Sequence, residues 1–149
     1  MYSDTVTIFN RYESRLGDMW YPTVLHGVNV MSDRAAIVQK YGEESQDNAV
    51  INVHYQTVDG KIYVDGKEYL TPKAWDKQTN DKLPETITFT PGEKFDFVYM
   101  GAFFSENPIS DDEYENGFYD YMNSEFDGVF AITSVSKLNA IPHFEITGK

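Results

Sequence analysis

The chain has 149 residues, of which 41% are hydrophobic and 15% aromatic, and 24 acidic against 12 basic residues give it a net charge of -12. This apolar content excludes a disordered chain, and the absence of cysteine excludes disulfides, thiolate metal sites and cysteine nucleophiles. The negative charge opposes binding to DNA or to an anionic membrane surface, and no run of about 18 apolar residues predicts a membrane span. We therefore expect one folded domain over residues 1–149.

Short strands separated by tight turns dominate the chain. Runs rich in β-branched and aromatic residues predict strands at 5–9, 20–30, 49–56, 61–64, 87–89, 95–100, 129–135 and 141–146. Asp59-Gly60 and Asp65-Gly66 are turn signals, because glycine readily supplies the positive φ that such turns need. Gly27 lies inside the second run and predicts a bulge or a sharp bend. The stretch 33–41 suits either a helix or a strand, and its β-branched residues favour a strand.

One segment predicts a helix. Ser110 followed by Glu113 has the spacing of a capping box, and the acidic residues of this first turn suit the positive end of a helix dipole. Apolar side chains then follow at spacings of three and four. We predict an amphipathic helix from about Asp111 to Phe126, within an insertion over about residues 103–128. The remaining strands predict an all-β fold, a small antiparallel β-barrel.

Acidic residues are concentrated in residues 101–128, which contain eight of them and no lysine or arginine. They are Glu106, Asp111, Asp112, Glu113, Glu115, Asp120, Glu125 and Asp127. A solvated surface that aids solubility is one interpretation; the others are the wall of a channel through which DNA slides and a mimic of DNA. A calcium loop starting at Asp112 is disfavoured, because Tyr114 and Asn123 stand where the loop needs acidic ligands.

No catalytic or cofactor-binding pattern emerges from the sequence. His26, His54 and His143 stand on three different predicted strands and have no partner at a metal-ligand spacing. There is no Gly-x-Ser-x-Gly motif, and the Gly-Lys pairs at 60–61 and 66–67 lack the upstream glycine of a phosphate loop. We therefore predict a non-enzymatic protein without a metal or a cofactor.

Four segments carry a resemblance to a known family. They are residues 5–12 (TVTIFNRY), 20–28 (WYPTVLHGV), 69–75 (YLTPKAW) and 132–148, which begin ITSV and end PHFEITG. In this order and spacing they resemble small phage and prophage virion proteins of Gram-positive bacteria that are encoded among head-tail joining proteins. The motif residues with a structural role are Trp20, Tyr21, Pro22, Gly27, Pro72 and Trp75.

The resemblance implies a minor structural protein of the virion: a head-completion, connector or stopper subunit repeated as a ring around the portal axis. Its partners would be portal, connector and tail proteins, with no direct affinity for nucleic acid or membrane. It would be made in the host cytoplasm and form a ring in the virion, and for the isolated chain both a monomer and an oligomer stay open. A ring of such acidic chains would form a channel to which DNA does not adhere.

The apparent loop from Tyr69 to Pro84 holds our candidates for subunit contacts. They are Leu70, Lys73, Trp75, Lys77 and Lys82, of which the lysines would meet an acidic neighbour. Two other functions stay open: an acidic DNA mimic that inhibits a DNA-binding protein, and a β-sandwich module that binds a ligand.

Overall fold

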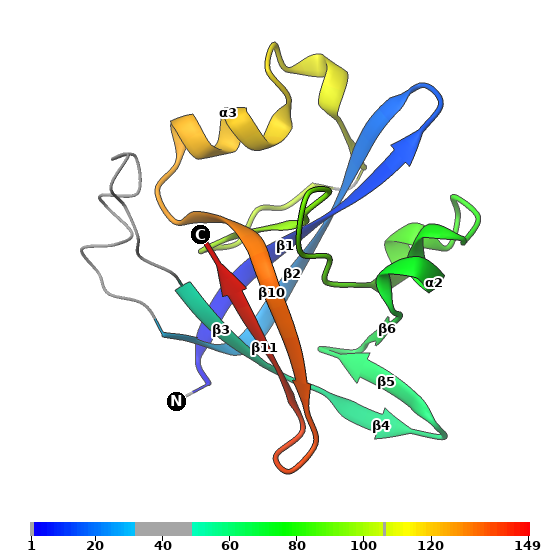
Figure 1. Ribbon diagram of the computed structural model, residues 1–149, viewed down its shortest axis with the longest axis vertical. Coiled ribbons are helices and arrows are strands. Elements are labelled where there is room, and N and C mark those ends of the chain that lie inside the picture. The colour runs from blue at the N-terminus through cyan, green and yellow to red at the C-terminus, as the bar shows by residue number, and fades with distance from the viewer. Residues whose placement is uncertain (1, 32–48, 106) are drawn as a thin grey trace.

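The computed structural model describes residues 2–31, 49–105 and 107–149, and this part of the chain is mostly β (Figure 1). One antiparallel sheet contains β1 (Asp4–Ser14), β2 (Gly17–Met31), β3 (Ala49–His54), β8 (Phe97–Tyr99), β9 (Ile109–Ser110), β10 (Val129–Leu138) and β11 (His143–Gly148). Its order is β1-β8-β10-β11-β3-β2-β9, and β1 also pairs with β2. The predicted all-β class is thereby confirmed. The predicted strand at 33–41 lies outside the described residues.

A second, smaller sheet stands beside the first. It consists of β4 (Gln56–Val58), β5 (Lys61–Val64), β6 (Lys67–Tyr69) and β7 (Thr86–Ile87), in that order. The two predicted turns join its first three strands: Asp59 and Gly60 have φ values of 53° and 79°, and Asp65 and Gly66 have 47° and 84°. Positive φ at both central residues is the geometry that matches the twist of a two-residue hairpin.

β2 and β10 each pair with different partners along their lengths. Residues 17–28 of β2 pair with β1, whereas residues 29–31 pair with β3. Gly27, with φ at 69°, has no partner in the register with β1, where Thr5 pairs with His26 and Asp4 with Val28, and this confirms the predicted bulge. β10 pairs with β8 through residues 129–131 and with β11 from Ile132 onward. Strands that bend from one layer into another in this way form the corners of two crossed layers.

The prediction of a small barrel requires correction, because the large sheet is not closed as a barrel. Its strands pair in two groups, β9-β2-β1-β8-β10 and β2-β3-β11-β10, which share β2 and β10. The strand predicted at 61–64 lies in the separate smaller sheet as β5.

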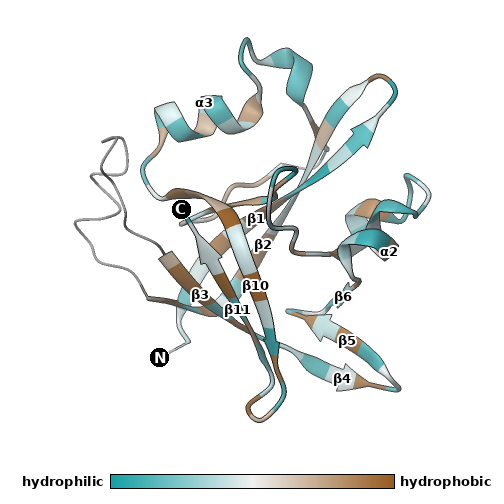
Figure 2. Ribbon diagram, viewed as in Figure 1, coloured by the Kyte–Doolittle hydropathy of each residue, from teal (hydrophilic) through white to brown (hydrophobic). Residues whose placement is uncertain are grey.

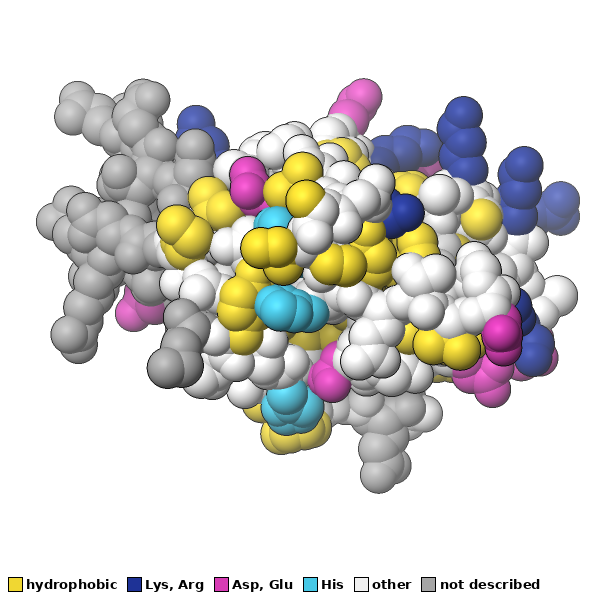
Figure 3. All heavy atoms as spheres, turned by 90° about the horizontal axis from the view of Figure 1, so that it is seen from below, with side chains coloured by type: hydrophobic (Ala, Val, Ile, Leu, Met, Phe, Trp, Pro, Cys, Tyr) yellow, Lys and Arg dark blue, Asp and Glu magenta, His cyan; other side chains and the backbone are white. Residues whose placement is uncertain are grey.

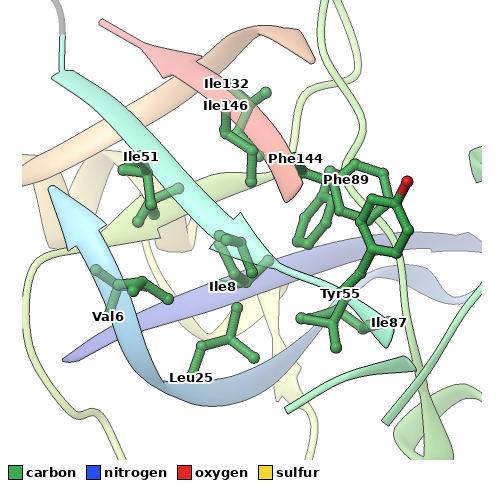
Figure 4. Close-up of a cluster of buried hydrophobic side chains, with 14 residues drawn as sticks. Val6, Ile8, Leu25, Ile51, Tyr55, Ile87, Phe89, Ile132, Phe144 and Ile146 are labelled. Carbon is green, nitrogen blue, oxygen red and sulfur yellow. The ribbon is translucent and has the colours of Figure 1, made fainter. Parts of the chain in front are cut away.

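The main core fills the space between the layers and is aliphatic at its centre. Figure 4 shows side chains from β1, β2, β3, β10 and β11 converging there with Ile87 and Phe89. Its members include Val6, Ile8, Leu25, Ile51, Val98, Ile132, Phe144 and Ile146, each at most 1% exposed. Full burial of such a side chain contributes about 1.5–3 kcal/mol. Figure 2 shows the matching hydrophobic colour along β3 and at the start of β10.

The predicted helix over 111–126 is wrong in its first half. The structure has a 3-10 turn, η2 (Asp111–Glu113), followed by a separate helix, α3 (Phe118–Glu125). Tyr114 ends η2 in an extended conformation, with φ at -119° and ψ at 136°, and Gly117 precedes α3 with φ at 92°, so no helix continues from η2 into α3. The capping box does not form either, since the Ser110 side chain makes no capping hydrogen bond. No helix of the described residues is long and apolar enough to cross a membrane.

Candidate functional site

The predicted acidic residues lie together at one end of the molecule. η2 and α3 form the top of the view in Figure 1, and we call residues 111–127 the acidic end. Six carboxylates there are exposed: Asp112, Glu113, Glu115, Asp120, Glu125 and Asp127. Asp111 is half-buried, and Glu106 lies outside the described residues.

Asp111 attaches the acidic end to the sheet. Its Oδ1 accepts a hydrogen bond from the Trp20 indole Nε1 at 2.9 Å and another from the backbone N–H of Phe118 at 2.8 Å. The second bond satisfies one of the free N–H groups at the start of α3, where a negative charge also opposes the helix dipole favourably. Asp111 therefore has a structural role that separates it from the exposed carboxylates.

α3 packs on an aromatic cluster that lies beneath it. Phe118 and Met122 are fully buried against Phe9, Trp20 and Phe97. The rings of Phe9 and Phe97 stack with centroids 4.6 Å apart, and Trp20 meets Phe97 edge-on at 4.9 Å. With eight residues α3 is too short to be stable alone, so this packing and Asp111 together set its direction.

Carboxylates are crowded where η2 meets the β1–β2 hairpin. Asp18 lies near Glu13, Asp111 and Asp112, and partial burial, followed by these neighbouring negative charges, raises the pKa of its carboxyl. The Arg11 guanidinium opposes that shift. It lies over the rings of Trp20 and Phe95, at 4.6 and 4.9 Å from their centroids. Among the residues that the structure describes, no group of three or more His, Cys, Asp or Glu could hold a metal ion.

The apparent loop at 69–84 contains a short helix, α2 (Pro72–Asp76), followed by the 3-10 turn η1 (Leu83–Glu85). Thr71 caps α2 through its Oγ1, and Pro72 stands in the first turn, where the missing N–H costs nothing. Trp75 is only 2% exposed and packs against Tyr21 and Leu83. The prediction of Trp75 as a subunit contact is therefore wrong, because the side chain is enclosed by its own chain.

The other predicted contact residues are accessible to different degrees. Lys73, Lys77 and Lys82 are exposed, and Leu70 is half-buried. Beside α2 lies an open hollow of about 220 Å³, which we call the α2 hollow. It is lined by Arg11, Glu13, Pro72, Lys73, Trp75, Asp76, Thr90 and Lys94.

The residues of the resemblance motifs have structural positions. Trp20 and Tyr21 are buried in the clusters below α3 and beside α2. Pro22 is half-buried in β2 opposite Phe9, and Gly27 forms the bulge.

The three histidines are closer together than their spacing in the sequence indicates. His54 and His143 are directly paired across β3 and β11. His26 and His54 line a hollow of about 270 Å³ at the base of the β4–β5 hairpin, together with Tyr63 and Asp65. Figure 3 shows the histidine side chains in a row on one face. No local pattern reveals this arrangement, because it depends on strand pairing over 89 residues.

A buried carboxylate, Asp96, joins three segments of the fold. Its side chain accepts hydrogen bonds from Asn10 Nδ2 and from the backbone N–H groups of Arg11 and Thr90, at 2.8–2.9 Å. Full burial raises the pKa of Asp96 to about 7, since the loss of solvation outweighs these three donors, which favour the charged form.

The fold and these surfaces define a mostly β protein with one strongly acidic end and a cationic hollow beside α2. The chain belongs to a family of unknown function, DUF6751, whose model matches residues 1–149. No curated protein and no solved structure matches the chain.

Replacing Asp111 tests its role in holding the acidic end. Asp111→Ala leaves the Trp20 indole and the Phe118 N–H without their acceptor, so we expect a loss of about 1–3 kcal/mol in unfolding free energy. Asp111→Asn keeps an Oδ1 acceptor and should lose less. Urea denaturation followed by circular dichroism measures both, and equal stability of Asp111→Ala and the unmodified chain would contradict the role.

Asp96 predicts a specific pH dependence of stability. The folded chain keeps the Asp96 proton up to about pH 7, whereas an unfolded chain releases it near the ordinary value of 3.8. Between these pH values the folded state therefore binds more protons than the unfolded state. The resulting contribution to the unfolding free energy is complete below about pH 4. As the pH rises it decreases by about 1.4 kcal/mol per pH unit and is lost by about pH 7. Denaturation at several pH values should show this decrease, and Asp96→Asn, which cannot titrate, should remove it. The same slope in both proteins would refute the assignment.

Proposed function

We propose that this protein is a non-enzymatic structural subunit of a phage or prophage virion, with a place in head-tail joining as a connector, stopper or head-completion protein. The observation that carries the proposal is the acidic end, where six exposed carboxylates are held on a packed support. The four segments that resemble head-tail joining proteins supply the class of assembly.

The acidic end suits a wall along which DNA moves. A ring of six or twelve copies would repeat the acidic end around its axis, and the field of its exposed carboxylates would repel DNA phosphates. Asp111 and the aromatic packing of α3 keep these charges in a defined direction. Such a surface needs shape and potential only, so no reacting group has to be positioned.

The resemblance motifs support the proposal because they build the structure that carries the acidic end. Trp20 donates its indole N–H to Asp111, and the adjacent Tyr21 packs on Trp75. The expected partners are portal, connector and tail proteins, and the expected assembly is a ring of identical chains in the virion, formed in the host cytoplasm.

Particles released by the host that encodes this chain test the proposal directly. We expect the chain in purified, DNA-filled particles at a fixed ratio to the portal protein, measured by quantitative mass spectrometry. Deleting its gene should leave filled heads and free tails unjoined, as seen by electron microscopy, and expression from a plasmid should restore joining. Infectious particles that lack the chain would refute the proposal.

The acidic end also predicts the behaviour of the isolated protein towards DNA. Fluorescence anisotropy with duplex DNA at about 50 mM salt should show no binding, because low salt strengthens repulsion between like charges. Neutralising the exposed carboxylates at 112, 113 and 115 to their amides serves as the matched comparison. Tight binding by the unmodified chain would contradict the channel-wall function, and potent inhibition of a DNA-binding enzyme would favour a DNA mimic instead.

A further inference from the structure

We propose that the α2 hollow is the docking site for the acidic end of a second copy of this chain, with Lys73 and Lys77 of one copy facing Glu113 and Glu115 of the next. The inference rests on the proposed function, since it names the neighbour in the assembled ring. Docking uses Glu113 and Glu115, which leaves the exposed Asp112, Asp120, Glu125 and Asp127 of each copy for the channel wall. The contact joins two different surfaces of identical chains and is therefore head-to-tail.

The α2 hollow is lined by more positive than negative charge. Arg11, Lys73 and Lys94 line it together with Glu13 and Asp76, and Pro72 adds an apolar surface. Figure 3 shows Lys and Arg side chains at the right-hand end, the side on which α2 lies in Figure 1, with Asp and Glu side chains among them. Opposite charges across an interface orient the two partners.

Two of the lysines on and near α2, Lys73 and Lys77, are available to an acidic partner. Lys94 is 3.0 Å from Glu13 and Lys82 is 3.5 Å from Glu85, so these cations are already paired. Lys73 and Lys77 are exposed and make no ion pair with any residue that the structure describes. They stand on α2 and at its C-terminal cap, so the helix fixes their spacing.

The complementary charges are on the same chain but on a different surface. Glu113 and Glu115 are exposed and have no ion-pair partner among the described residues. In Figure 1 the tip of the β1–β2 hairpin separates η2 from α2. An acidic end and a cationic hollow that are kept apart within one chain can meet between two chains.

The net charge of -12 determines how salt affects this contact. Whole chains repel one another, but at 0.15 M ionic strength charges more than about 8 Å apart are largely screened. Opposite charges in direct contact still attract. We therefore expect association near 0.15 M salt and its loss at about 1 M, where the screening length is about 3 Å.

Two charge-reversal variants test the docking by sedimentation equilibrium. Lys73→Glu with Lys77→Glu makes the chain more negative, whereas Glu113→Lys with Glu115→Lys makes it less negative. A general effect of net charge would change the association of these variants in opposite directions. Docking predicts that both pairs weaken self-association at least about tenfold. The fourfold variant, which carries both reversals and the original net charge, should recover it.

Lys61→Glu with Lys149→Glu is the matched control, because both lysines are exposed and neither lines the α2 hollow. This control has the same net charge as Lys73→Glu with Lys77→Glu. It should nevertheless associate far more tightly than that variant, because it leaves Lys73 and Lys77 in place. Circular dichroism checks that every variant folds. A wild-type chain that stays monomeric up to about 1 mM, or association that neither reversal weakens, would overturn the inference.

The particle experiment separates this inference from the proposed function. If the chain is found in particles but neither charge reversal weakens its self-association, the docking is refuted and the virion function stands. If the chain is absent from particles but its self-association responds to the charge reversals as predicted, the virion function is refuted and the docking stands.

Discussion

The Asp111 carboxylate accepts one hydrogen bond from a core tryptophan and one from the first turn of α3. This pair of bonds determines where the acidic end points, because α3 has eight residues and would not form without support. The exposed carboxylates of the acidic end thus have a fixed position relative to the two layers. Both proposed properties, a surface that repels DNA and a surface that docks on α2, require that fixed position.

Local patterns predicted the longer strands and the two Asp-Gly hairpin turns, because alternation and Asp-Gly pairs act over a few residues, but they missed the short strands β6 and β9. The bulge at Gly27 was predictable for the same reason. The folding of the sheet into two layers was not, since it depends on β2 and β10 changing partners over long separations in sequence. The helix prediction failed between Tyr114 and Gly117, where an extended residue and a positive φ separate η2 from α3 despite favourable spacing.

The candidate site was predicted only in outline. Counting acidic residues located the acidic end, but could not show that Asp111 is a structural acceptor. Trp75 was predicted as a subunit contact because it lies in an apparent loop, whereas it packs on the distant Tyr21. Asp96, between two phenylalanines, resembles the solvent-facing residue of a strand, and only the three-dimensional fold brings Asn10 and Thr90 to it.

β11 lies between β10 and β3 in the large sheet, although it is the last of the described strands along the chain. During synthesis on a ribosome, β3 therefore has to wait for a hydrogen-bonding neighbour that is translated about 90 residues later. Its unpaired edge would expose Ile51 and Val53 to other nascent chains in that interval. Rapid release of residues 143–148, or a chaperone that covers β3, would then raise the share of this protein that reaches its folded form.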